Sequence, residues 1–455
     1  MTLNERSGLT RRHWLAGMAA GSAAFKFLEA GASAQTGQNR PVNRYSAPSQ
    51  LKITDMRACT IAGVTGLDYP IIRIDTNQGV YGLGEVRDGG VAGWALVLKP
   101  HLVGKNPLDI EPLLDNLRQF ANHRRGGGGY SAVDTALHDI AGKVYGVPCW
   151  RLLGSKYRDR VRIYCHFPQA QDPKKFAEGV RLRKEQGFTF YKMDDLSAAR
   201  LLNGVPGAVQ SNGVATDKGI KLMCERIELV RQIVGWEAPL AADHFGPLDV
   251  KESIRLARAF EPYRLAWMED ILQVGTLRAG DAPMNWRAYK EIREATLTPL
   301  AVGESLFGLP EGFKDFIDNR AIDVIHPDLL TAGGLRETKR IADYASLYGI
   351  PTACHYVASP VGCMATVHAI ATMKDFLAME TMAPSHPWWD DLVTGLPKPI
   401  IQNGYIQVPE APGLGIELNE DVVKQHLAEP GYFLPTPQYD NFIIDDLKRY
   451  RRKQP

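Results

Sequence analysis

The sequence predicts a parallel α/β barrel preceded by a small α+β domain. The first observation is a set of three short apolar runs, at residues 240–243, 265–269 and 300–304, each of which ends in a carboxylate. Helical patterns separate the runs, and strand–helix–strand repeats at this spacing match the roughly 31 residues per unit of a βα barrel. The second observation is a different pattern before residue 155, where strands in hairpin order precede helices. That pattern is typical of an α+β domain.

The three carboxylates, Asp243, Glu269 and Glu304, predict a metal site. In a parallel barrel the carboxyl ends of the strands open onto one face, so the three side chains converge there. Carboxylates in such a position repel one another unless a cation joins them, and an all-oxygen set of ligands suits Mg²⁺. Any one of them read alone is more simply a solvated or capping acid. Three in register predict one Mg²⁺ per subunit.

The composition of the chain gives no indication of a nucleic-acid partner, a membrane span or a zinc site. The chain has 455 residues, with 53 Lys+Arg against 51 Asp+Glu and no long basic block, which argues against a nucleic-acid partner. It has no uninterrupted apolar run of about 18 residues, so we expect no membrane insertion of the mature protein. Its six cysteines are scattered without a zinc spacing and are interpreted as mostly buried thiols.

The amino terminus resembles an export signal. Arg11-Arg12 precedes a mildly apolar segment and then Ala32-Ser33-Ala34, which predicts a twin-arginine-type signal peptide over residues 1–34 and a flexible leader over residues 35–50. Substrates of that route fold before export, so free cysteines and a preloaded metal are compatible with a periplasmic location. The alternative is a disordered leader with a chance arginine pair on a cytoplasmic protein.

Residues 51–155 are predicted to form the α+β capping domain. The strands are expected at residues 52–61, 69–75 and 80–86, and the helices at 91–98, 110–120 and 131–143. Residues 126–129, four glycines, are interpreted as a hinge or loop. The last helix is expected to be amphipathic with Ser131 as its cap. Its polar residues are interpreted as surface or interface groups: Asp134, His138 and Asp139.

Residues 156–385 are predicted to form the barrel, and residues 386–455 a strand-like tail that returns to the capping domain. Besides the three carboxylate runs, strands are expected at residues 161–165, 188–193, 322–328, 350–355 and 376–380. Lys192 and Asp194 lie two residues apart, so an extended chain points both side chains to the same side. The long loop over residues 196–217 is expected to shape a substrate pocket.

Taken in order, these motifs resemble the enolase superfamily, in particular its mandelate racemase/muconate lactonizing enzyme group and the acid-sugar (galactonate-type) dehydratases. The resemblance covers residues 51–418, and the motifs that carry it are the helix at 131–143, the three carboxylate strand ends, Pro327-Asp328, Ala332-Gly333-Gly334, and His355 followed by Ser359-Pro360-Val361-Gly362. It implies a modified TIM barrel, (β/α)7β, under an α+β capping domain (enolase-like).

The resemblance also implies roles for individual residues. Members of this family remove the proton α to a carboxylate, and Mg²⁺ on the three acids stabilises the enediolate that forms. His355 then matches the general base, with Asp328 fixing its tautomer. Glu380 matches the residue that, when protonated, hydrogen-bonds a substrate carboxylate oxygen, and Lys192 matches the first lysine of a Lys-x-Lys pattern.

Two departures from the family pattern bear on the reaction. Asp194 stands where the second lysine is expected, which removes a base on the opposite face and disfavours racemisation. Asp194 then either pairs with Lys192 or touches a substrate hydroxyl. Galactonate-type dehydratases carry Asp-x-His at the third strand, whereas this chain has Asp243-His244-Phe245. Either a loop redirects His244, or His355 serves as both base and acid, with Tyr356 as a third candidate acid.

The sequence therefore favours a Mg²⁺-dependent lyase that eliminates the β-hydroxyl of an aldonate- or uronate-type sugar acid to give a 2-keto-3-deoxy acid. An epimerase, racemase or cycloisomerase on the same scaffold is the nearest alternative. A non-catalytic exported protein that binds or senses a sugar acid is the alternative from another class. The family resemblance also implies a homo-oligomer.

Overall fold

The structure is a computed structural model that describes residues 48–63, 66–121, 127–245, 248–272 and 285–442. The predicted signal peptide and nearly all of the predicted leader lie outside these residues. Among the residues that are described, no helix is both long and apolar enough to span a membrane.

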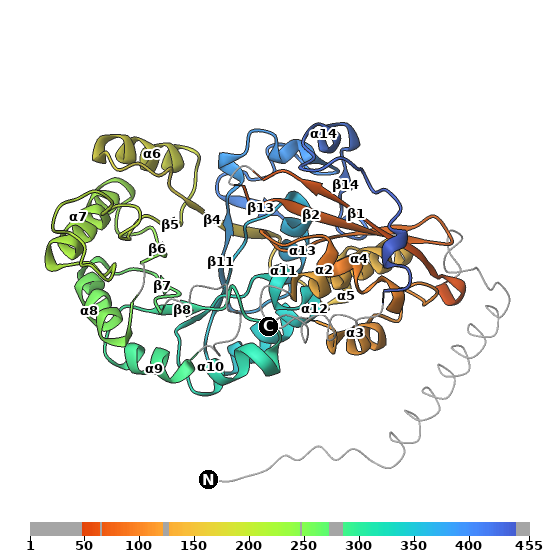
Figure 1. The fold of residues 1–455 in the computed structure, drawn as a ribbon, viewed down its shortest axis with the longest axis horizontal. Helices are drawn as coiled ribbons and strands as arrows, with labels where there is room; N and C mark the ends of the chain where they lie inside the picture. Colours follow the sequence, from red (N-terminus) through yellow and green to blue (C-terminus); the bar gives the residue numbers. More distant parts are fainter. Residues whose placement is uncertain (1–47, 64–65, 122–126, 246–247, 273–284, 443–455) are drawn as a thin grey trace, which may run out of the picture. The chain divides into compact units, whose positions relative to one another are not determined.

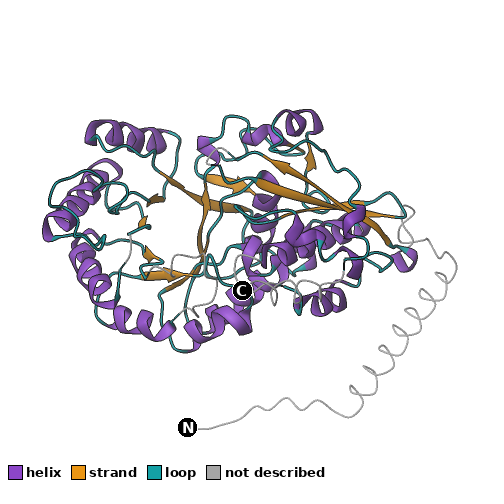
Figure 2. Cartoon of the chain, viewed as in Figure 1, coloured by secondary structure: helices purple, strands orange, loops and turns teal. Residues whose placement is uncertain are grey.

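Eight parallel strands form a closed barrel, which confirms the predicted fold class (Figures 1 and 2). Each strand pairs with the next, and the last pairs with the first, Met379 lying opposite Ile163. The strands are β4 (Arg160–His166), β5 (Tyr191–Met193), β6 (Leu240–Ala242), β7 (Met268–Glu269), β8 (Leu300–Val302), β9 (Val324–Ile325), β10 (Thr352–Cys354) and β11 (Phe376–Thr381).

Seven helical crossovers connect the eight strands, as (β/α)7β requires. Figure 1 shows these helices around the outside of the barrel. They are α6 (Pro173–Glu185), α7 (Asp217–Val234), α8 (Val250–Phe260), α9 (Trp286–Glu294), α10 (Lys314–Asp318) after the π-helical turn η5 (Leu309–Phe313), α12 (Gly334–Leu347) after the short α11 (Leu329–Ala332), and α13 (Pro360–Ala371). Side-chain caps open several of them, as the sequence pattern suggests; Asp249 of α8, for example, accepts from the backbone of Glu252.

One layer of side chains fills the barrel interior. It takes one residue from or beside each strand, and three aromatic rings lie among smaller side chains: Tyr164, Phe190, Ala241, Trp267, Ala301, Val324, Ala353 and Ala378. All eight are buried. Because barrel interiors are packed cores and not pores, this layer closes the barrel beneath the carboxyl ends of its strands.

The capping domain contains a three-stranded antiparallel sheet and a buried helix. The sheet has the order β1-β2-β3, and a tight turn joins β2 to β3. The elements are β1 (Ile53–Ile61), β2 (Tyr69–Thr76), β3 (Tyr81–Glu85), α2 (Gly93–Leu96), α3 (Ile110–Arg118), α4 (Gly128–Tyr145) and α5 (Cys149–Leu152), with the 3-10 turns η1 (Pro48–Gln50) and η2 (Lys99–His101).

Helix α4 differs from the expectation in two respects. It begins at Gly128, so Ser131 lies inside it and donates to the carbonyl of Gly127 at 3.1 Å instead of capping it. It is buried on nearly all sides and is not amphipathic, because β3 covers one side while α11 and α12 cover another. The predicted Ser131 cap and the predicted amphipathic pattern are wrong for this reason.

The glycines before Ser131 start a helix and do not form a hinge. An added Cβ would lie 2.4 Å from the Phe307 ring at Gly127 and 2.1 Å from the Trp94 carbonyl oxygen at Gly129. Glycine is therefore required here for close packing against α2 and the barrel. The prediction of a loop at residues 127–129 is wrong, and Gly126 lies outside the described residues.

Two acids of α4 join the capping domain to other parts of the fold. Asp134 accepts from the backbone N–H of Leu335 at 2.6 Å, at the start of α12. Asp139 accepts from Leu83 in β3 at 3.0 Å and from Leu414 in the carboxyl-terminal segment at 2.9 Å. Both are fully buried, so they are interface groups.

The carboxyl-terminal segment contacts both the barrel and the cap. β13 (Tyr405–Gln407) pairs antiparallel with the first half of β4, and β12 (Val393–Thr394) pairs with β14 (Glu417–Leu418). Short helices complete the segment: η6 (Ala383–Ser385), η7 (Trp389–Leu392), α14 (Glu420–Gln425) and η8 (Pro437–Tyr439). Single bridges then join Ile61 to Leu427 and Ala58 to Leu434. The domain boundaries themselves stay predictions.

Candidate active site

The three predicted metal ligands lie together at the carboxyl ends of three consecutive strands. Asp243 directly follows β6, Glu269 ends β7, and Glu304 follows β8 by one glycine. One carboxylate oxygen from each lies within 4.8 Å of the others. Asp243 and Glu269 are buried and Glu304 is nearly so. Three carboxylates that meet at the carboxyl ends of neighbouring barrel strands fit a hard divalent cation such as Mg²⁺.

Lys192 supplies positive charge beside these acids. Its ammonium lies 2.9 Å from Glu380, 3.1 Å from Glu269 and 3.4 Å from Asp243. Burial alone lowers the pKa of a lysine, but the three carboxylates outweigh it and hold the pKa of Lys192 well above its usual value. The lysine is therefore charged and limits the repulsion among the acids.

His355 and Asp328 form the predicted dyad. Nδ1 of His355 lies 2.7 Å from Oδ2 of Asp328, and a backbone bridge joins the two residues. Oδ1 of Asp328 accepts from the backbone of Leu330 at 2.7 Å, because Asp328 caps α11, so the carboxylate is fixed in orientation. Nε2 of His355 faces the other way, 3.2 Å from Glu304 and 3.8 Å from Glu380.

The charges around His355 favour its protonated form in this structure. Burial lowers its pKa, but Glu304, Glu380 and the bond to Asp328 together raise the pKa to about 9. Arg87 acts in the opposite direction, because its positive charge lowers that pKa. Neutralisation of Glu304 therefore favours the free base.

Glu380 and Glu269 are fixed by buried groups that the sequence did not single out. The hydroxyl of Tyr164 donates to Glu380 at 3.0 Å, and the indole of Trp267 donates to Glu269 at 3.2 Å. The ring of His326 lies between the two acids, 3.3 Å from Glu269. Burial raises the pKa of Glu269, but the facing His326 and Lys192 outweigh burial and lower that pKa to about 2. Burial likewise raises the pKa of Glu380, and Lys192 is the main group that lowers it below its usual value.

A second histidine at the barrel mouth was not predicted. His166 ends β4, and its Nδ1 hydrogen-bonds Asp194 while its Nε2 hydrogen-bonds Glu380. Burial of the ring lowers the pKa of His166, an effect that the Glu380 carboxylate opposes. One signal could have found it, since it follows an apolar run just as the carboxylates do. Asp194, whose role the sequence left open, pairs with this histidine.

Arg87, which comes from the cap, is also new. Its guanidinium is almost fully buried and lies 2.9 Å from Asp88, 3.0 Å from the hydroxyl of Thr331 and 3.3 Å from the carboxylate of Glu304. It also lies 3.8 Å from Asp328. One cation from the capping domain thus holds both a candidate metal ligand and the partner of the candidate base.

His244 and Tyr356, the other candidate acids, have different surroundings. His244 has a positive φ of 59°, and its side chain is 53% exposed, with Nε2 3.7 Å from Asp243. Phe245, the residue at the position of the family histidine, is buried. The hydroxyl of the buried Tyr356 donates to the carbonyl of Ser359, so its proton is committed to the backbone.

Two other groups of side chains come close enough to hold an ion, but each includes a histidine nitrogen. They are Asp194, Asp243 and His244, and Glu269, His326 and Glu380. The set at the ends of β6, β7 and β8 offers only carboxylate oxygens, which are the ligands that Mg²⁺ prefers. Of the three groups, it is therefore the best candidate for the metal.

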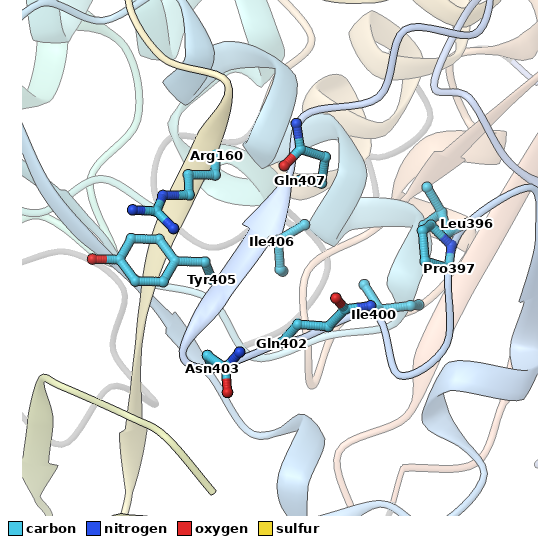
Figure 3. A pocket seen from close by; sticks show the side chains of 9 residues that line it. All are labelled: Arg160, Leu396, Pro397, Ile400, Gln402, Asn403, Tyr405, Ile406 and Gln407. Carbon is cyan, nitrogen blue, oxygen red and sulfur yellow. The ribbon is translucent and has the colours of Figure 1, made fainter.

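A surface pocket of about 320 Å³ lies elsewhere (Figure 3). It is bounded by the amino end of β4 and by β13, and the guanidinium of Arg160 lies 4.3 Å from the ring of Tyr405. The acids described above lie at the opposite, carboxyl ends of the strands, where the active sites of such barrels occur. This pocket is therefore not the candidate active site.

The chain matches two family models over most of its length. Residues 46–154 match the N-terminal domain of mandelate racemase/muconate lactonizing enzyme, and residues 175–422 match the domain described as enolase C-terminal domain-like. The chain is also similar to a solved mandelate racemase/muconate lactonizing enzyme-like protein from Rubrobacter xylanophilus. The TM-score is 0.74 at 32% identity, with 85% of this chain and 100% of that one covered.

Curated relatives are dehydratases, that is, hydro-lyases. The D-xylonate dehydratase of Haloferax volcanii is 36% identical over 391 residues, covering 83% of this chain and 89% of that protein. A D-galactonate dehydratase family member of Cellvibrio japonicus is 31% identical over 407 residues, covering 83% and 95%. The D-mannonate dehydratase of Novosphingobium aromaticivorans is 29% identical over 429 residues, covering 86% and 98%.

Proposed function

Because the chain belongs to the mandelate racemase/muconate lactonizing enzyme group of the enolase superfamily, we propose that it dehydrates a sugar acid to a 2-keto-3-deoxy acid. The proposal rests on two sets of residues that lie together at the carboxyl ends of the barrel strands. Three carboxylates end β6, β7 and β8, and the His355–Asp328 dyad faces them from β10 and the end of β9. The names of the relatives support the substrate class.

Asp243, Glu269 and Glu304 are proposed to hold one Mg²⁺. The donor set is all oxygen and comes from three neighbouring strand ends, so it fits such an ion. When bound, the ion supplies positive charge that stabilises the negative charge developing on the substrate carboxylate. Lys192 is proposed to bind that carboxylate as well. Glu380 is proposed to bind it only after taking up a proton, because the ionised form, which Lys192 favours here, would repel a second carboxylate.

His355 is proposed to take the α-proton at Nε2. Asp328 accepts from Nδ1, which fixes the tautomer whose Nε2 lone pair is free and stabilises the imidazolium once the proton has moved. With Glu304 neutralised, one of the charges that raise the pKa of His355 to about 9 is removed, so that pKa falls and more of the ring is present as the free base.

Proton NMR in D₂O against a panel of acid sugars tests the proposal. The panel begins with D-xylonate, D-galactonate and D-mannonate, and the protein is loaded with Mg²⁺. We expect loss of the α-proton together with a new deoxy methylene signal. His355→Asn abolishes both signals, and Asp243→Asn or a chelator lowers turnover until excess Mg²⁺ is restored.

Three outcomes would contradict the proposal in different ways. Exchange of the α-proton without a new product would indicate an epimerase, racemase or cycloisomerase. Tight binding of an acid sugar that survives His355→Asn, without any product, would indicate a binding or sensing protein. Silence across the complete panel would show that the substrate class is wrong.

A further inference from the structure

We propose that His166 is the general acid that protonates the departing hydroxyl, and that Asp194 is its positioning residue. If the proposed dehydratase function holds, His166 provides the proton transfer that the sequence leaves open among His244, His355 and Tyr356. It lies at the barrel mouth with Asp194 and Glu380 as its partners.

His166 and His355 occupy equivalent positions on either side of Glu380. Each ring binds an aspartate through Nδ1, and the aspartate lies on or beside the adjacent strand. Each ring also points Nε2 toward Glu380, His166 at Oε1 and His355 at Oε2. The barrel order β10, β11, β4 places the two histidines on the strands that flank Glu380. The site therefore has two His–Asp dyads around one carboxylate.

The dyads differ in what their Nε2 atoms face. His355 lies 3.2 Å from Glu304, on the side of the metal ligands, where removal of a proton next to the bound carboxylate takes place. Among the described residues, no metal ligand has a hydrogen bond to His166. A substrate whose carboxylate lies between the candidate metal ligands and Glu380 therefore places its α-carbon near His355 and its β-carbon toward His166.

The two contacts of His166 suit a proton donor. Nδ1 contacts Asp194 and Nε2 contacts Glu380. A neutral imidazole carries one N–H and can donate to only one of the two carboxylates, whereas the protonated ring donates to both. Because burial lowers the pKa of the ring, the protonated form readily passes its Nε2 proton to a hydroxyl that replaces Glu380.

The rival donors are less well placed. His244 is mostly exposed, and Tyr356 donates its proton to the carbonyl of Ser359. The ring of His326 is completely buried beneath Glu269 and Glu380, with Nδ1 3.2 Å from the carbonyl of Ala353. His166 combines partial exposure, 12% of its side chain, with a ring nitrogen directed into the site.

The step is balanced as an elimination. The C2–H bond breaks, its proton moves to Nε2 of His355, and its electron pair forms the C2=C3 bond. The C3–O bond breaks, and the hydroxyl takes a proton from Nε2 of His166 and leaves as water. The enol then becomes the 2-keto-3-deoxy acid by moving its hydroxyl proton to solvent and gaining one at C3. Solvent takes the proton from Nε2 of His355 and returns one to the Asp194–His166–Glu380 group, so both dyads regain their starting states.

A substrate with a better leaving group tests the role directly. Fluoride departs without protonation, so a 3-deoxy-3-fluoro acid sugar needs the base but no acid. On whichever of D-xylonate, D-galactonate and D-mannonate the wild type converts fastest, His166→Asn should lower kcat by about 10²–10⁴-fold. On the 3-fluoro analogue, kcat of the same variant should stay within about tenfold of the wild-type value, because the leaving fluoride needs no proton donor and so loses nothing when the acid is removed.

The exchange reaction and two further variants separate chemistry from structure. His166→Asn should still exchange the α-proton with D₂O, whereas His355→Asn should lose exchange and both eliminations. Asp194→Asn should slow the hydroxyl substrate by roughly 10–100-fold and leave the fluoro substrate nearly unchanged, the pattern of a positioning residue. His101→Asn, which alters a ring stacked on Phe120 in the cap, serves as the matched control.

Each result that would contradict the proposal has a different explanation. Equal losses on both substrates in His166→Asn would overturn the acid role and make His166 only a support for Glu380. Unchanged turnover of the hydroxyl substrate would place the acid elsewhere, with His355 itself as the remaining candidate. If the wild type converts no acid sugar, the proposed function fails and the inference fails with it, whereas wild-type turnover without an effect of His166→Asn overturns the inference alone.

Discussion

At the scale of single residues, the site is organised by charges that compensate one another across domains. Arg87 provides the clearest case, because it reaches from the cap to Glu304, Asp328 and Asp88 while being almost fully buried. A buried cation among three acids is held by all of them, and each acid in turn depends on it. The orientation of the candidate base and of one candidate metal ligand therefore depends on a residue that is neither a candidate ligand nor the candidate base.

Arg87→Met tests this dependence. The variant keeps the apolar length but removes the charge that lowers the pKa of His355, so we expect that pKa to rise. Since the base must be neutral, the acid limb of the pH profile of kcat/KM should move to higher pH, and kcat/KM at neutral pH should fall by about 10–100-fold.

The matched control is Arg118→Met, which removes another arginine that joins the cap to the barrel, through Glu311 and Glu337. That change should lower stability but leave the pH profile in place. An unshifted profile in Arg87→Met would show that the arginine has only a structural role.

The sequence could predict part of this site and not the rest. Polar residues that end apolar runs were found, because strand ends of a parallel barrel share one face: Lys192, Asp243, Glu269, Glu304, Asp328, His355 and Glu380. Tyr164 and Trp267 lie inside such runs, where the pattern does not distinguish them from other core residues. Arg87 lies more than 200 residues from the acid that it binds, a separation that no local pattern bridges.

At the scale of elements, the same limit explains helix α4. Its pattern was read as amphipathic, yet tertiary contacts cover it on several sides, and its first glycines allow contacts too close for any side chain. The helices on the outside of the barrel, such as α8, have one buried face, and α8 and α9 lie where helical patterns were expected, between the runs that end in carboxylates. Periodicity identifies a helix reliably, but it does not show how many neighbours the helix has.

Helix α13 is another buried element, and its His368 predicts a pH dependence of stability. Nδ1 of His368 accepts from the backbone of Trp150 at 3.3 Å, which ties α13 to α5, and burial lowers its pKa from 6.5 to about 4. Between these two values the unfolded chain binds a proton that the folded chain does not. His368 therefore contributes stability above pH 6.5, and this contribution is lost as the pH falls toward 4.

His368→Asn should show a smaller loss of unfolding free energy on acidification than the wild type, by up to about 3 kcal/mol between pH 7 and pH 4. The asparagine oxygen can still accept from Trp150 but cannot be protonated in this range. Urea unfolding at several pH values measures the difference. His426→Asn, in which a ring stacked on Trp388 is lost, should keep the wild-type slope; equal slopes for all three proteins would contradict the prediction.

At the scale of the whole molecule, the fold class followed from the spacing of βα units, and the closure of the barrel by β4 and β11 confirms it. What spacing could not give is how the cap and the carboxyl-terminal segment are held against the barrel. The structure shows that buried acids do this by accepting backbone hydrogen bonds. Glu85, at the end of β3, accepts from Ser359 and Gly362 at the start of α13, and Asp134 accepts from the start of α12.

Asp139 tests whether such buried acids hold the fold together, because it joins α4 to β3 within the cap and joins the cap to the carboxyl-terminal segment. Its carboxylate accepts from Leu83 of β3 and Leu414 of the carboxyl-terminal segment, and it pairs with Lys143 at 3.0 Å. Asp139→Ala leaves two buried N–H groups without an acceptor and a largely buried ammonium with fewer partners. We expect the free energy of unfolding to fall by roughly 3–5 kcal/mol.

Asp139→Asn keeps one acceptor oxygen and should lose less, whereas Asp343→Ala, which breaks an exposed pair with Lys339, should change stability by less than about 1 kcal/mol. Urea unfolding followed by tryptophan fluorescence measures all three variants. If this carboxylate makes the cap and the carboxyl-terminal segment one cooperative unit, Asp139→Ala shifts a single transition as a whole. A new early transition, with the main one unmoved, would show instead that the cap unfolds independently and that Asp139 stabilises only its own helix.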